Sequence, residues 1–280
     1  MQIVRTRSRQ EHLERLQLYA ATRARPPVFA FWSAALLHDL PLLNAAPSTI
    51  HVVAGGPRTG AAQGVVRHRR AAARSAVARH GLLATSAAQT VAALAGRTSF
   101  VEGVVLADHA LATAAFGERR PLATRAELMA SAAELDDPAE RRRAYAVARF
   151  ADARAESPLE SMSRATMALA GAPTPDLQYT VLDLHGVVAR LDFVWPELEL
   201  AGEADGAEKL VHPAFGRSPD AWQVLAAQAE RQRRVEATGL RMITWQWATG
   251  RRVDRMREFL VQQGVPLDPR TRREELGLES

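Results

Sequence analysis

Helix-like and strand-like segments alternate along the second half of the chain, and this order constrains the fold more than any other feature. Segments with helical spacing of apolar residues cover 157–170, 219–237 and 251–263. Strand-like runs separate them at 177–183, 187–195, 199–204 and 240–247. This alternation predicts an α/β domain over 157–264, with a central mixed sheet flanked by helices. The polar residues 265–280 are expected to form a tail.

The first half is predicted to form a separate α/β region over 1–118. Helices are expected at 9–24, 31–37 and 99–116, and a further strand at 82–84 leads into a helix capped at Thr85 or Ser86. The strands 50–53 and 65–69 flank a glycine-rich stretch, which predicts a β-hairpin with an arginine at its tip. Residues 119–156 are expected to be a helical connector, with a helix start at Asp136-Asp137-Pro138.

Charge is distributed unevenly between the two halves. Residues 1–100 contain 13 arginines and 3 acids, which gives +10, whereas the whole chain carries +5. No acid occurs between Asp39 and Glu102. An acid-free basic stretch is typical of a surface that binds a polyanion, most often nucleic acid. The alternative is a basic surface that contacts only solvent.

The candidate phosphate contacts in the basic stretch are arginines: Arg58, Arg67, Arg69 and Arg70. The absence of cysteine excludes disulfides and cysteine-based zinc sites. The chain has no run of 18 apolar residues and begins with a polar, arginine-rich segment. These features indicate a cytoplasmic protein without a membrane partner. There is no phosphate-binding loop, dinucleotide fingerprint or nucleophile elbow.

Three carboxylates are expected to converge in segment 189–209. If the tight turn at Pro196 pairs Trp195 with Leu200, Asp192 lies opposite Glu203, and Asp205 follows on the same face. In this strand, Leu191, Phe193 and Trp195 should share the other face. Like charges placed directly opposite destabilise a sheet, so this arrangement calls for a compensating cation.

Oxygen ligands of this kind suit Mg²⁺ or Mn²⁺, so Asp192, Glu203 and Asp205 are the predicted metal ligands. A bound divalent ion lowers the pKa of its water and stabilises charge on a phosphate oxygen. The alternative is that Asp192 forms a salt bridge with an arginine and that Glu203 and Asp205 are ordinary turn residues. Spacing alone leaves both interpretations open.

Lys209 is the only lysine of the chain, and it follows Asp205 by four residues. A lysine beside a metal site can act as a point charge on a phosphate or on an attacking water. The alternative is an ordinary surface lysine. The arginines Arg231, Arg233 and Arg234 are expected to lie on an exposed helix face, with a phosphate contact as the alternative.

Motifs in the second half resemble a known domain. The stretches SPLESMSR (157–164), PDLQY (175–179), RLDFVWPE (190–197), GEADGAEK (202–209) and GLRMITWQW (239–247) are similar to the C-terminal domain of a large actinobacterial group. That domain is similar to the very-short-patch-repair-like endonucleases of the restriction-endonuclease-like PD-(D/E)XK superfamily. Upstream, WSAALLHDLP (32–41), IHVV (50–53) and GLLATSAAQTVAALA (81–95) resemble AbiE-type antitoxin-like proteins.

The resemblance implies a role for several residues. Asp192 would be the main metal ligand, Glu203 the acid of the second motif, Glu160 the helix acid and Gln178 a first-strand residue facing the site. The superfamily's usual lysine, two residues after Glu203, is replaced by aspartate, and Lys209 stands downstream.

Two functions follow as hypotheses. The first is a DNA-associated protein whose nuclease-like domain hydrolyses phosphodiester bonds with Mg²⁺ or Mn²⁺. The second is a non-catalytic, antitoxin-like regulator that binds DNA, or a toxin protein, and uses the nuclease fold as a scaffold. Metal binding distinguishes the two, because a scaffold needs no ion.

Overall fold

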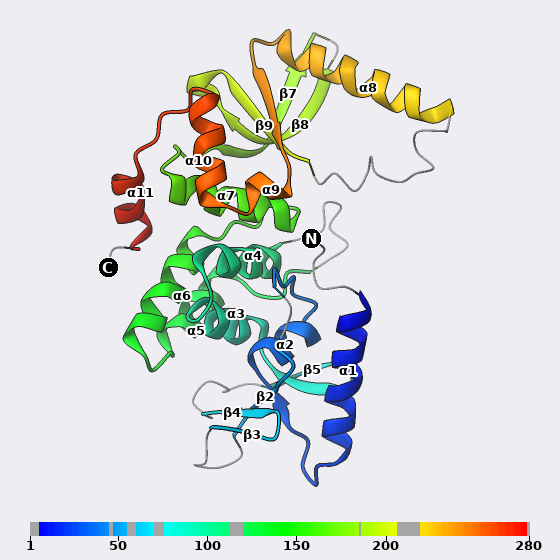
Figure 1. The fold of residues 1–280 in the computed structure, drawn as a ribbon, viewed down its shortest axis with the longest axis vertical. Helices are drawn as coiled ribbons and strands as arrows, with labels where there is room; N and C mark the ends of the chain where they lie inside the picture. Colours follow the sequence, from blue (N-terminus) through cyan, green and yellow to red (C-terminus); the bar gives the residue numbers. More distant parts are fainter. Residues whose placement is uncertain are drawn as a thin grey trace. The chain divides into compact units, whose positions relative to one another are not determined.

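The chain folds into two compact units, each of which combines helices with a β-sheet. The computed structural model describes residues 6–44, 47–54, 60–69, 76–112, 120–184, 186–205 and 219–278 (Figure 1). The first unit holds Met1–Pro158 with Leu276–Leu278 and Ser280, and the second holds Leu159–Glu275 with Glu279. Among the described residues, no helix has both the length and the apolar character needed to span a membrane.

The first unit contains a mixed six-stranded sheet in the order β3-β4-β2-β1-β6-β5. Its strands are β1 (Val28–Phe29), β2 (Ile50–Val53), β3 (Gly60–Ala62), β4 (Val65–His68), β5 (Ala76–Arg79) and β6 (Leu82–Thr85). β1 runs antiparallel to β2 and parallel to β6, and β5 runs antiparallel to β6.

The expected hairpin between 50–53 and 65–69 is wrong. β2 and β4 are parallel, with Ile50 opposite Val65. The glycine-rich stretch contains the additional strand β3, which pairs with β4 in the antiparallel sense. The tight turn between β3 and β4 is Gln63-Gly64, and both residues have positive φ angles of 50° and 75°. Glycine adopts a positive φ without strain, which favours a tight turn at Gly64. The hairpin is therefore formed by β3 and β4 rather than by β2 and β4.

In the described part of this unit the helices are α1 (Thr6–Ala21), α2 (Phe31–Leu37), α3 (Ala87–Ala95), α4 (Phe100–Leu111), α5 (Arg125–Ala133) and α6 (Pro138–Phe150). The predicted helix starts are confirmed. Ser86 and Gln89 form a reciprocal capping box on α3, and Asp137 accepts hydrogen bonds from the first turn of α6, where Pro138 follows it.

The segment 119–156, expected to be a connector, contributes to the packing of the first unit. Its helices α5 and α6 pack against α3, and α6 also packs against α4 (Figure 1). Leu128, Ala132 and Val147 are almost fully buried in this packing. The apolar face of each helix therefore needs the neighbouring helices to exclude water.

The second unit contains a four-stranded sheet in the order β10-β9-β8-β7. Its elements are α7 (Pro158–Ala170), β7 (Asp176–Asp183), β8 (Gly186–Trp195), β9 (Leu200–Ala204), α8 (Pro219–Glu236), β10 (Arg241–Trp245), α9 (Trp247–Gly250), α10 (Val253–Gln262) and α11 (Pro269–Leu276). β8 runs antiparallel to β7 and β9, whereas β10 is parallel to β9. The predicted mixed sheet flanked by helices is therefore present.

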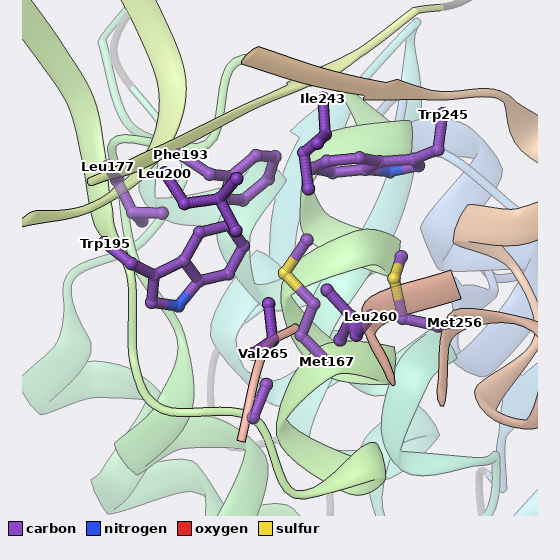
Figure 2. Close-up of a cluster of buried hydrophobic side chains, with 11 residues drawn as sticks. Met167, Leu177, Phe193, Trp195, Leu200, Ile243, Trp245, Met256, Leu260 and Val265 are labelled. Carbon is purple, nitrogen blue, oxygen red and sulfur yellow. The ribbon is translucent and has the colours of Figure 1, made fainter. Parts of the chain in front are cut away.

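Helices cover both faces of this sheet. On one face, aromatic and aliphatic side chains of the strands meet Met167 of α7 and Met256 and Leu260 of α10 (Figure 2). On the other face, Val194 and Ala201 pack against Val235 of α8. The expected polar tail is wrong in its first part, because Val265 is buried in the core and α11 follows it.

The side-chain alternation of β8 differs from the prediction at one point. Phe193 and Trp195 face α7 and α10, but Leu191 belongs to the cluster on the α8 face. In β7, Gln178 has a left-handed backbone with φ of 53° and forms no ladder pair with Asp192. Such a conformation in a non-glycine residue is strained, and it interrupts the pleat at this position. The candidate site lies at this interruption.

Candidate functional site

The predicted pairing of Trp195 with Leu200 is confirmed, but the ladder between β8 and β9 stops before the expected pair of Asp192 with Glu203. Trp195 pairs with Leu200 and Phe193 with Gly202, as the turn at Pro196 requires. The ladder ends there, and the backbone N–H of Ala204 donates instead to Oδ2 of Asp192 at 3.0 Å. The side chain of Asp192 on β8 therefore forms a hydrogen bond with the end of β9.

Gln178 connects two carboxylates, the buried Glu160 and the half-buried Asp192. Its Nε2 donates to Oε2 of Glu160 at 2.9 Å and lies 3.5 Å from Oδ1 of Asp192. Glu160 is on α7, and only 8% of it is exposed. Gln178 has a left-handed backbone in this arrangement, in which its amide contacts one acid on a helix and one on a strand. Strain of this kind is concentrated at functional sites.

The charge on Asp192 is poorly compensated. Burial raises its pKa to about 7, the neighbouring Glu160 and Glu203 act in the same direction, and the Ala204 N–H and the Gln178 amide act in the opposite one. Among the ion pairs formed by described residues, none involves Asp192. The arginine salt bridge considered from the sequence is therefore not found, and the neighbouring acids disfavour a negative charge on Asp192.

Glu203, in contrast, has a cationic partner. The guanidinium of Arg231 on α8 binds both carboxylate oxygens, with Nη1 3.4 Å from Oε2 and Nη2 bonded to Oε1. The side chains are only partly buried, with 22% of Glu203 and 38% of Arg231 exposed.

Sequence reasoning missed this contact, because it placed Arg231, Arg233 and Arg234 together on an exposed face. Arg234 instead binds Asp183 of β7, with its Nε 2.8 Å from Oδ2. Only Arg233 remains on the exposed side, where it pairs with Glu230. The i, i+3 spacing of Arg231 and Arg234 is the signal that could have shown that both lie on one helix face.

The predicted three-carboxylate metal set is not brought together. Asp205 follows the end of β9, and its backbone N–H donates to the carbonyl of Trp245 at 2.9 Å. Within the ranges that the structure describes, no group of three or more histidines or acids is arranged to hold a metal ion. A smaller donor set does fit. Mg²⁺ commonly takes one or two carboxylates and completes its shell with water, and Asp192 and Glu203 are two carboxylates close enough for Glu203 to raise the pKa of Asp192.

Three of the predicted site residues, Lys209, Arg58 and Arg70, lie outside the described residues. Arg67 is on β4 and is partly buried, and Arg69, directly after the strand, is exposed. Both belong to the first unit, whereas the carboxylates belong to the second.

A histidine pair in the first unit, in which His51 is buried and His68 is partly buried, was not predicted. Nδ1 of His51 lies 2.9 Å from Nε2 of His68, and the Thr49 hydroxyl lies 2.9 Å from the other ring nitrogen of His51. Phe31 stacks on His68 with ring centroids 3.9 Å apart. Burial lowers the pKa of each histidine to about 4, and the positive charge of Arg97 contributes in the same direction. A histidine within the apolar strand IHVV was the available signal.

Comparisons with known proteins give relatives but no function. No family model matches the chain, and no solved structure matches it. Two proteins named only as uncharacterized, from two strains of Mycobacterium tuberculosis, are each 34% identical to it over 169 residues. The match covers 59% of this chain and 58% of each relative, so the chain spans less than two thirds of their length. The chain is thus similar to mycobacterial proteins of unstated activity.

Proposed function

We propose that this protein associates with nucleic acid, with DNA rather than RNA as its substrate, and that its second unit is a Mg²⁺-dependent endonuclease that hydrolyses phosphodiester bonds. One observation carries the proposal: the half-buried Asp192 lies beside Glu160 and Glu203 and forms no ion pair of its own among the described residues. Carboxylates such as Asp192 and Glu203, at the ends of two strands, are oxygen donors of the kind that a divalent cation takes.

The fold supports the proposal at a coarser level. The second unit has a central mixed sheet with α7 and α10 on one face and α8 on the other (Figure 1). This architecture agrees with the restriction-endonuclease-like domain that the sequence motifs resemble. Fold resemblance alone does not establish catalysis, so the proposed activity depends on the carboxylates.

Each residue of the cluster has a distinct task in the proposed reaction. Asp192 and Glu203 would hold the ion, which supplies a water of lowered pKa and stabilises charge on the phosphate. The Ala204 N–H donates to Oδ2 of Asp192, and the Gln178 amide makes only a long contact of 3.5 Å with Oδ1, the oxygen that would face the ion. The Gln178 amide orients Glu160 beside Asp192. Lys209 would contribute a positive charge near the phosphate.

The first unit would supply affinity for the polyanion. Arg67 and Arg69, together with Arg58 and Arg70, lie in the acid-free stretch of the sequence. Contacts from such arginines to phosphates are independent of base sequence and weaken steeply with salt. This role requires no specific reading of bases.

A second candidate function is the non-catalytic regulator, which binds DNA or a toxin protein and uses the same fold as a scaffold. The contact between Arg231 and Glu203 favours it, because an arginine already neutralises one proposed metal ligand. The separation of Asp205 from the cluster favours it as well.

A cleavage assay distinguishes the two functions. The full chain is incubated with linear and supercoiled DNA, and separately with RNA, in the presence of Mg²⁺, Mn²⁺ or a chelator. We expect divalent-dependent cleavage of DNA that Asp192→Asn abolishes and that the control Asp176→Asn, an exposed position on β7, retains. Equal cleavage by wild type and Asp192→Asn, or none by wild type under any condition, would contradict the endonuclease function.

A further inference from the structure

The contact between Arg231 and Glu203 joins a surface helix to the carboxylate cluster. Arg231 binds both oxygens of Glu203, and Glu203 is close enough to Asp192 to raise its pKa. The helix backbone is held in place independently, because Val235 is fully buried against the sheet and Arg234 binds Asp183. The Arg231 side chain can therefore move while α8 stays in position.

A divalent ion and Arg231 would compete for the same oxygens. The guanidinium uses both oxygens of Glu203, so each of them already has a cationic neighbour. A doubly charged ion bound to Glu203 would lie within a few ångströms of the guanidinium, and like charges at that distance repel strongly near a protein surface. Entry of the ion thus favours departure of Arg231 from Glu203.

The displaced guanidinium would have a natural second partner in the proposed substrate. Its planar fork matches the oxygens of a phosphate as well as those of a carboxylate. The side chain is 38% exposed, so it can turn outward without crossing the packed core. A phosphodiester that binds the ion would bring its oxygens next to the released arginine.

We propose that Arg231 is a phosphate-binding residue that occupies Glu203 until a divalent ion displaces it, so that ion binding and nucleic-acid binding reinforce each other. The inference rests on the proposed function, since it assumes that the ion binds at Glu203 and Asp192. It assigns Arg231 two successive partners, first the carboxylate and then the phosphate.

Calorimetric titration of the full chain with Mn²⁺ alone tests the first partner. Removing the competing guanidinium in Arg231→Gln should tighten Mn²⁺ binding by about tenfold, which corresponds to about 1.4 kcal/mol. The matched control is Arg233→Gln, since Arg233 lies on the same helix but pairs with Glu230 at 72% exposure. It should bind Mn²⁺ as wild type does. Unchanged Mn²⁺ affinity in Arg231→Gln would overturn the proposal.

Binding of a short DNA duplex with and without Ca²⁺ tests the second partner. Ca²⁺ takes the same oxygen ligands as Mg²⁺. The ion should raise duplex affinity severalfold in wild type and in Arg233→Gln, whereas Arg231→Gln should lose most of that increase. An increase of wild-type size in Arg231→Gln would overturn the phosphate role.

The variant Asp192→Asn separates failure of this inference from failure of the proposed function. If wild type binds Mn²⁺ and Asp192→Asn does not, the metal site stands, and an unchanged Arg231→Gln affinity counts against the role of Arg231 alone. If wild type binds no Mn²⁺, the proposed function fails, and the inference fails with it.

Discussion

Each unit of the protein contains a partly buried cluster of titratable side chains, and the pKa shifts of the two clusters have opposite signs. In the first unit, His51 and His68 share a hydrogen bond, and the Thr49 hydroxyl pairs with the remaining nitrogen of His51. Both ring nitrogens of His51 thus have a partner when the rings are neutral, and burial depresses the pKa of both histidines to about 4. No ion is required for this cluster to be stable at neutral pH.

Asp192 in the second unit is less fully compensated. Its amide and backbone donors satisfy only part of Asp192, whose pKa burial and like charges raise to about 7. The two clusters show that burial alone does not indicate a binding site. A buried group whose neutral form is fully hydrogen-bonded is structural, whereas one that keeps like charges around it calls for a ligand.

The largest expected effect is a gain of stability from Asp192→Asn in metal-free buffer at pH 8. The folded pKa of about 7 lies above the ordinary value of 3.8, so the native state is favoured below pH 3.8 and loses stability as pH rises towards 7. Removing the charge should stabilise the second unit by about 2 kcal/mol. Denaturant unfolding followed by tryptophan fluorescence measures this, because four of the five tryptophans lie in the second unit.

The matched variant Asp176→Asn should leave stability within about 0.5 kcal/mol, because Asp176 is exposed. A loss of stability in Asp192→Asn would show that its carboxylate is a structural anchor for Ala204, and the contrast between the two clusters would disappear.

The histidine pair should give the opposite pH dependence. Its folded pKa values of about 4 lie below the ordinary 6.5, so stability is complete above pH 6.5 and is lost as pH falls towards 4. We expect the first unit to lose about 1–2 kcal/mol between pH 7 and pH 5. Hydrogen exchange of β2 and β4, corrected for the intrinsic effect of pH, measures this loss.

The variant His68→Phe should flatten that pH dependence, because it removes one of the two depressed titrations and keeps a ring beside Phe31. Its stability at pH 7 should be lower, since Nδ1 of His51 no longer has a hydrogen-bond partner at position 68. A wild-type pH dependence in this variant would show that other groups cause the acid sensitivity.

The basic surface should have the smallest effect, and only on affinity. Replacing Arg67, Arg69 and Arg70 with alanine should reduce the salt dependence of DNA binding by about 0.9 in slope for each phosphate that is no longer neutralised. Folding should remain unchanged. Fluorescence anisotropy with a labelled duplex at several salt concentrations measures the slope, and an unchanged slope would remove these arginines from the interface.

The sequence predicts local features of this protein well. The turn at Pro196 sets the pairing of Trp195 with Leu200, and the caps at Ser86 and Asp137 set two helix starts. These signals depend on residues that are close together along the chain. The turn at Pro196 alone is enough to predict that Asp192 lies next to β9.

Features that depend on distant residues were not predicted. The left-handed backbone of Gln178 accompanies the shift of Leu191 to the other face of the sheet, and no sequence rule places this conformation at a glutamine. The partner of Glu203 comes from α8, 28 residues away. β2 and β4 are parallel because β3 runs back between them along the chain. The short-range turn signals did not predict this additional strand.

The most direct test of the proposed metal site is whether a divalent ion stabilises the second unit through Asp192. Unfolding of wild type and Asp192→Asn is measured at pH 8 with and without Mn²⁺. We predict that saturating Mn²⁺, at about 100 times its Kd, stabilises wild type by about 2.7 kcal/mol and leaves Asp192→Asn unchanged. An equal effect of Mn²⁺ on both proteins, or no effect on wild type, would contradict a metal site at Asp192.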